Sequence, residues 1–104
     1  MSKISGSEVT RLIIACEAGM GSSVMVAGMV KKALKKTNVS VSHSPVNQLA
    51  GENPDVVLCQ RGLSGRAKQA VPDVPVIAFD MFLGDPAITR VIEAVLNGTL
   101  ISDE

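Results

Sequence analysis

The sequence is poor in aromatic residues: its 104 residues include no tryptophan, no tyrosine and only two phenylalanines. Valine, isoleucine, leucine, alanine and methionine must therefore fill the interior. The hydrophobic fraction of 46% suffices for a single core that needs no disulfide or structural metal. This composition is typical of a compact α/β protein. We expect one domain over residues 1–104, with an ordered core at about residues 9–98.

The sequence also lacks a net charge, because ten basic residues are balanced by ten acidic ones. A neutral chain has no general electrostatic affinity for nucleic acid, so we expect no nucleic-acid partner. No apolar stretch approaches the ~20 residues of a membrane span. The first eight residues lack the apolar core of a signal peptide. We therefore expect a cytoplasmic protein.

Cysteine and histidine are scarce: the chain contains only Cys16, Cys59 and His43. The two cysteines are far apart, and no pair stands at the short spacing of metal ligands. We therefore expect reduced thiols, and neither a metal nor a cofactor. A lone histidine at the end of a strand is expected to be an ordinary surface residue.

Four short apolar or alternating segments are typical of β-strands. These predicted strands cover about residues 11–15, 39–43, 56–59 and 75–79. Segments with helical periodicity follow three of them, at about residues 22–36, 63–70 and 86–97. The alternation predicts an α/β fold with a four-stranded parallel sheet in the order 2-1-3-4 and helices on both faces.

The ends of these segments carry further predictions. Asp85 is expected to cap the last helix, with Pro86 as its first residue and Gly98 just beyond its end. The last helix is expected to bury Ile88, Val91, Ile92, Val95 and Leu96. Pro45 is expected to break the second strand, and Ser64 to cap the short helix. Residues 1–8 and 99–104 are expected to be loose.

The first predicted strand runs into the segment Cys16-Glu17-Ala18-Gly19-Met20-Gly21-Ser22-Ser23, which leads into a helix. Its glycines and serines predict a tight loop whose backbone N–H groups point inward. The helix start adds about half a positive elementary charge, so a thiolate or a phosphate is stabilised there. In a sheet of this order, ligands bind at the switch point between the first and third strands, where this loop falls. We predict that Cys16 carries a phosphoryl group.

The phosphate is predicted to be held by backbone amides and serine hydroxyls. The residues of this predicted cradle are Glu17, Ala18, Gly19, Met20, Gly21, Ser22 and Ser23. The Glu17 side chain is expected to point to solvent, because its carboxylate would repel a phosphate dianion.

Three other functions remain open at this stage. Low-molecular-weight protein tyrosine phosphatases carry an arginine six residues after the cysteine, where this chain has Ser22, and that arginine clamps the phosphoryl group. They also use an Asp-Pro acid, for which Asp85-Pro86 is a candidate, although a helix start produces the same dipeptide. A redox or arsenate-reductase-like enzyme would form a Cys16–Cys59 disulfide. The third alternative is a catalytically silent regulatory module.

The segment from Cys16 to Met25 resembles the phosphocysteine loop of enzyme IIB domains of the bacterial phosphoenolpyruvate-dependent sugar phosphotransferase system (PTS). It is nearest to the mannitol-type branch, whose members typically read Ala-Cys-Asp-Ala-Gly-Met-Gly-Ser-Ser-Ala-Met, and the implied fold is that of lactose/cellobiose-like IIB proteins. The likeness covers about residues 11–96. It continues through Arg61-Gly62-Leu63, Arg66-Ala67 and Phe82-Leu83.

The resemblance implies a phosphotransferase that acts in sugar transport. Cys16 would take a phosphoryl group from a histidine of a IIA protein and pass it to a sugar or sugar alcohol, such as mannitol, held by the membrane-embedded IIC protein. The chain would then be cytoplasmic and peripheral to the inner membrane through IIC. Gln60 and Gly62 depart from the family's histidine and aspartate, which leaves the sugar open.

Two groups of side chains are candidates for auxiliary roles. Arg61 and Arg66 are the cations that we place near the phosphate. Partner contact is expected from apolar side chains near the loop, because methionine adapts to alternative partners. These candidates are Met20, Met25, Met81, Phe82 and Leu83.

Overall fold

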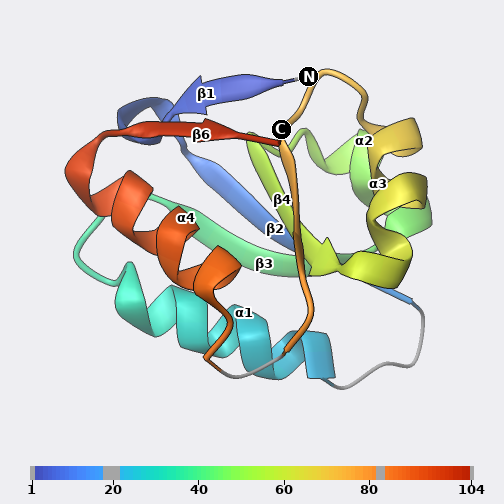
Figure 1. The fold of residues 1–104 in the computed structure, drawn as a ribbon, viewed down its shortest axis with the longest axis horizontal. Helices are drawn as coiled ribbons and strands as arrows, with labels where there is room; N and C mark the ends of the chain where they lie inside the picture. The colour runs from blue at the N-terminus through green and yellow to red at the C-terminus, as the bar shows by residue number, and fades with distance from the viewer. Residues whose placement is uncertain (1, 18–21, 82–83, 104) are drawn as a thin grey trace.

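The structure is a computed structural model that describes residues 2–17, 22–81 and 84–103. A four-stranded parallel sheet forms the centre of the molecule (Figure 1). The sheet has the order β3-β2-β4-β5, which confirms the predicted strand order and fold class. Its strands are β2 (Arg11–Cys16), β3 (Ser40–Pro45), β4 (Val56–Gln60) and β5 (Val76–Phe79).

The two central strands, β2 and β4, are apolar because side chains cover both of their faces. Leu12 lies opposite Val56, and Ile14 lies opposite Leu58. These four side chains belong to one core cluster, whereas the alternate residues, such as Ile13, belong to another. The alternation of side chains along a strand thus divides the core into two layers.

Helices cover both faces of the sheet (Figure 1), as predicted. The first layer of core lies under α1 (Ser22–Ala33) and α4 (Pro86–Asn97). The second lies under shorter elements. These are η2 (Val46–Gln48), α2 (Leu49–Glu52), η3 (Arg61–Leu63) and α3 (Ser64–Ala70).

Helix α4 begins and ends as its sequence predicts. Asp85 is the N-cap and accepts a hydrogen bond of 2.8 Å from the backbone N–H of Ala87. Gly98 adopts φ 71° at the C-cap, a left-handed conformation that glycine reaches without strain. The expectation that Leu96 is buried is wrong, because its side chain is 53% exposed.

The terminal segments pair with each other, so the expectation that they are loose is wrong. Strand β1 (Lys3–Ser5) runs antiparallel to β6 (Leu100–Ser102), and Ile4 lies opposite Ile101. Both isoleucines pack against the α1/α4 layer of the core. Burial of this pair explains why two short strands outside the main sheet are ordered.

The turn η1 (Gly6–Glu8) that follows β1 lies against α4. A Cβ atom at Gly6 would stand 1.9 Å from the backbone oxygen of Ala94, so only glycine fits at this contact. The Gly6 backbone N–H also donates to the carbonyl of Thr99 at 2.7 Å. This approach joins the terminal ribbon to the last helix.

The Asp103 carboxylate fixes the end of the ribbon. It accepts hydrogen bonds from the Ser2 backbone N–H at 2.8 Å, from the Lys68 ammonium, and from the Val76 backbone N–H at 3.3 Å. The Asp103 side chain is only 6% exposed. Desolvation raises the pKa of this buried carboxyl, but the hydrogen bonds outweigh it and lower the pKa to about 2.

Three predictions about the ends of elements are wrong. Helix α1 ends at Ala33, because short-range bonds such as Thr37 N–H to the Leu34 carbonyl at 3.0 Å close the chain into a turn. Pro45 is the last residue of β3 instead of breaking it, which an edge strand tolerates. Ser64 does not cap α3; its hydroxyl donates to the carbonyl of Arg61 at 2.8 Å.

No helix in the described ranges is both long and apolar enough to cross a membrane.

Candidate active site

Cys16 is the last residue of β2, at the edge of the sheet where the parallel strands end. We call this edge the carboxyl edge. Strand β2 lies between β3 and β4, and Cys16 pairs in register with Pro45 of β3. The chain leaves β2 for α1 on one face and returns from β3 to β4 by way of α2 on the other. Cys16 therefore stands at the topological switch point, where α/β sheets bind ligands.

The Cys16 thiol is buried, with 6% of the residue exposed. Helix α1 begins at Ser22, so its positive N-terminal end follows the cysteine closely in the chain. Four residues of the predicted cradle, 18–21, lie outside the described residues, and so do the side chains of Ser22 and Ser23. The cradle therefore stays a prediction.

Cys59 is fully buried on β4, in register with Ala15 of β2. It belongs to the core layer under α2 and α3. Cys16 is one residue further along β2, so strand alternation directs it to the opposite face of the sheet. Two Cβ atoms that point to opposite faces cannot be bridged by a disulfide without backbone movement. Burial also raises the pKa of the Cys59 thiol to about 11, which keeps it protonated.

Arg61 lies at the carboxyl edge, after β4, but an acidic partner already holds it. Its guanidinium donates to both carboxylate oxygens of Asp80, at 2.7 and 3.2 Å. Both side chains are more than 60% exposed, at 65% and 62%. The hydrogen bonds raise the pKa of Arg61 and lower the pKa of Asp80, so both groups stay charged.

Asp85 has a structural role at the same edge. Besides capping α4, its carboxylate accepts from the backbone N–H groups of Asp80 at 2.7 Å and Met81 at 2.9 Å. Hydrogen bonds from Met81, Ala87 and Asp80 lower the pKa of the Asp85 carboxyl. A general acid must carry a proton near neutral pH, so this environment is unlike that of a phosphatase acid.

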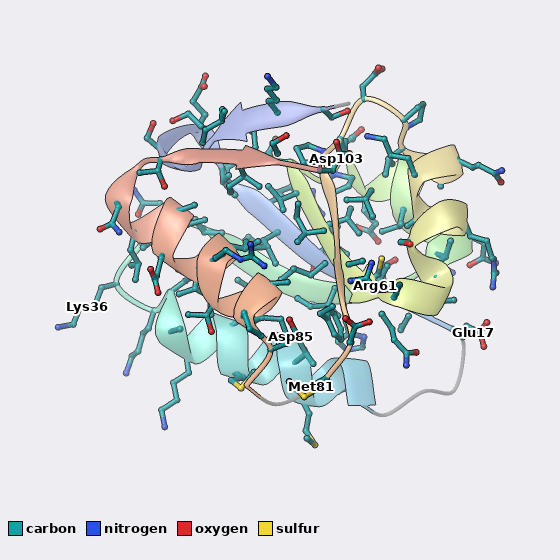
Figure 2. The ribbon with its side chains drawn as sticks, in the orientation of Figure 1. Glu17, Lys36, Arg61, Met81, Asp85 and Asp103 are labelled. Carbon is teal, nitrogen blue, oxygen red and sulfur yellow. The ribbon has the colours of Figure 1, made fainter. Side chains whose placement is uncertain are left out.

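Arg66 and Glu17 form an ion pair that the sequence did not reveal. The Arg66 guanidinium, on α3, donates to the Glu17 carboxylate at 3.0 Å. Glu17 is exposed, as predicted, and directly follows Cys16. Figure 2 shows Glu17 and Asp85 in the lower part of the molecule and Arg61 near its middle, whereas Asp103 lies near the chain ends above.

The remaining candidates sort by exposure. Met25 is 54% exposed and Met81 is 53% exposed, which favours partner contact over core packing for both. Met20, Phe82 and Leu83 lie outside the described residues. His43 is exposed on β3, in register with Ile14 in the middle of β2. Within the described part of the chain, no three His, Cys, Asp or Glu side chains are grouped as metal ligands.

Comparison with known families identifies the family of the chain. The sequence model of the family described as "PTS system, Lactose/Cellobiose specific IIB subunit" matches residues 11–94. The chain belongs to the PTS IIB family. The resemblance inferred from the Cys16 segment is thereby confirmed, and the IIB match spans the whole parallel sheet and the four α-helices, except for the last residues of α4.

Several curated relatives carry the mannitol name. The IIB chain is 36% identical over 94 residues to the "PTS system mannitol-specific EIICB component" of Bacillus subtilis, a match that covers 88% of this chain and 20% of that protein. It is 36% identical over 93 residues to the "PTS system mannitol-specific EIICBA component" of Escherichia coli, covering 86% of this chain and 14% of that protein. The EIICB component of Staphylococcus haemolyticus is 41% identical over 83 residues, covering 77% and 16%. The chain thus spans about a fifth or less of the length of these relatives.

Proposed function

We propose that the chain is the phosphocysteine carrier of a sugar phosphotransferase system, with Cys16 as the residue that is phosphorylated. The observation that carries this proposal is the position of Cys16: it ends a central strand of a IIB-family sheet, at the switch point and six residues before α1 begins. Such a position supports anion binding by backbone amides and a helix N-terminus.

In the first step, the Cys16 thiolate attacks the phosphorus atom of a phosphohistidine on a IIA protein. The S–P bond forms and the P–N bond breaks, and the imidazole nitrogen keeps the electron pair and takes a proton. In the second step, a hydroxyl oxygen of the sugar attacks the same phosphorus atom. The S–P bond breaks, the thiolate is restored, and the hydroxyl proton passes to a base at the acceptor site.

A carrier must hold its phosphoryl group without giving it to water. The chain has Ser22 where phosphatases of similar architecture have their clamping arginine. Arg61 is held by Asp80, and Asp85 is engaged by three backbone N–H groups. These features favour transfer over hydrolysis.

The proposed acceptor is mannitol or a related polyol bound by a membrane-embedded IIC protein. The names of the relatives, mannitol-specific EIICB and EIICBA components, support both the polyol and the IIC partner. The IIA donor follows from the chemistry of the carrier cycle. On this proposal the chain acts on the cytoplasmic side of the membrane, which it reaches through IIC.

The proposal is tested by intact mass after incubation with phosphoenolpyruvate, the general transfer proteins and a mannitol-type IIA. We expect the chain to gain the mass of one phosphoryl group. The chain should lose that group to mannitol when mannitol and membranes that contain IIC are added. The matched variant Cys16→Ser should gain none, whereas Cys59→Ala should behave as the native chain does. A chain that gains no phosphate would contradict the carrier and favour a silent regulatory module. Steady release of inorganic phosphate from an aryl phosphate would favour a phosphatase.

A further inference from the structure

The charges at the carboxyl edge are arranged in pairs. Arg61 is bound to Asp80, and Arg66 is bound to Glu17 at 3.0 Å. Glu17 is the carboxylate nearest to Cys16 in the chain, since it directly follows that residue. In the described part of the protein, Arg66 is the side chain that forms an ion pair with Glu17.

An unpaired Glu17 would oppose the proposed reaction. The incoming phosphoryl group carries about two negative charges, and a carboxylate beside it repels it. A cation that holds the carboxylate on the α3 side cancels most of this repulsion and directs the negative charge away from the thiol. The pair is exposed, at 58% and 53%, so its value lies in the local field and not in the stability of the fold.

We propose that Arg66 is a positioning residue that acts through Glu17: the ion pair neutralises the carboxylate of the residue that follows Cys16 and holds it on the α3 side, so that an anionic reactant can reach the sulfur. This inference rests on the proposed carrier function for its biological meaning. The effect on Cys16 itself does not depend on phosphoryl transfer, since it applies to any anion that approaches the sulfur.

Two small alkylating reagents measure this effect directly. Iodoacetate is anionic and iodoacetamide is neutral, and the two are nearly equal in size, so the ratio of their rates at Cys16 reports the local charge. By Coulomb's law in water, a unit charge at about 6 Å from a reacting atom changes such a ratio about threefold at low ionic strength, and a more distant charge changes it less. Cys59 is fully buried and protonated, and modification of a Cys16→Ser chain gives the background.

Four variants give the expected pattern. Arg66→Met lowers the iodoacetate-to-iodoacetamide ratio, by up to about threefold, because it leaves Glu17 unpaired. Arg66→Lys keeps the native ratio. Glu17→Gln raises the ratio, and the double variant Glu17→Gln/Arg66→Met returns it to the native value, because both charges are then absent.

The chain supplies a matched control at the other end of β2. Arg11 donates to the Glu52 carboxylate at 3.1 Å, and these side chains are 44% and 41% exposed. Arg11→Met breaks a surface pair of similar geometry far from Cys16, so it should leave the ratio unchanged. A ratio that falls as much in Arg11→Met as in Arg66→Met would overturn the proposal.

Phosphoryl transfer from a mannitol-type phospho-IIA separates action through Glu17 from direct contact with the phosphate. If Arg66 acts through Glu17, Arg66→Met slows transfer and the added Glu17→Gln change restores it. If Arg66 contacts the phosphoryl group, the double variant stays as slow as Arg66→Met, and the proposal is wrong. A chain that shows the alkylation pattern but accepts no phosphoryl group would refute the carrier function and leave the charge effect standing.

Discussion

The Asp103 carboxylate allows a quantitative prediction about stability. Its pKa of about 2, against an ordinary value of 3.8, means that the ionised carboxylate is more stable in the folded state than in the unfolded state. This difference corresponds to about 2.5 kcal/mol of unfolding free energy at neutral pH. Because the side chain is only 6% exposed, little of this energy is lost to solvent screening.

We therefore expect Asp103→Asn to lower the unfolding free energy by about 2.5 kcal/mol at pH 7. In a domain of this size, that loss lowers the midpoint of thermal unfolding by about 10–20 °C. Since the folded pKa is depressed, the contribution is complete above about pH 4 and disappears as the pH falls towards 2. The native chain and the variant should then approach equal stability.

Urea unfolding followed by circular dichroism at pH 7, 5, 4 and 3 measures this gap. Asp73→Asn, at an exposed position, is the control for loss of a surface carboxylate and should leave the midpoint unchanged. Lys68→Met removes the cationic partner of Asp103, so it should also lower the unfolding free energy at pH 7. A gap between the native chain and Asp103→Asn that is the same at pH 3 as at pH 7 would refute the argument, because the loss would then come from packing and not from charge.

Three further results are expected. Gly6→Ala should destabilise the fold by about 1–3 kcal/mol, because its Cβ would overlap the backbone of α4. Gly28→Ala, at an exposed helical position with open space around it, should stabilise the fold by up to about 1 kcal/mol. Equal urea midpoints for the two variants would contradict both expectations. Mild oxidation of the native chain should give no Cys16–Cys59 disulfide by intact mass, since the thiols lie on opposite faces of the sheet. Asp85→Ala should lower the thermal midpoint more than Asp85→Asn does, yet leave phosphorylation of Cys16 intact; loss of phosphorylation in a folded variant would instead assign Asp85 a chemical role.

The main sheet could be predicted from the sequence because each of its strands carries a local signal. Val56-Val57-Leu58-Cys59 is an uninterrupted apolar run, and Asn53-Pro54-Asp55 separates it from the preceding segment. The same holds for α4, whose Asp85-Pro86 start and Gly98 end are encoded in single residues. Given strands that alternate with helices, the handedness rule leaves few orders for the sheet.

The terminal ribbon could not be predicted, because its signal is not local. Strands β1 and β6 have three residues each, and each contributes a single isoleucine to the core layer. Their pairing joins the two ends of the chain. Nothing within either segment distinguishes it from a polar tail, and only the folded sheet and α4 provide the surface against which Ile101 is buried and Ile4 partly buried.

The candidate site divides in the same way. The position of Cys16, at the end of a strand and ahead of a helix, could be predicted, because the apolar strand, the glycines and the helix start adjoin it in the chain. The partners of the arginines could not, since Arg61 with Asp80 and Arg66 with Glu17 are contacts between separate elements. From the sequence, both arginines are candidate cations near the phosphate, and the structure pairs each of them with a carboxylate.

The hydrogen bond of 2.8 Å from the Ser2 backbone N–H to Asp103 places the two chain ends in contact, and the same carboxylate accepts from Val76 at the first residue of β5. The ends therefore meet at the amino side of the sheet, away from the edge where Cys16 lies (Figure 1). Any polypeptide joined to either end, or to both, would leave from one corner. A tether at that corner would leave the edge that carries Cys16 unobstructed.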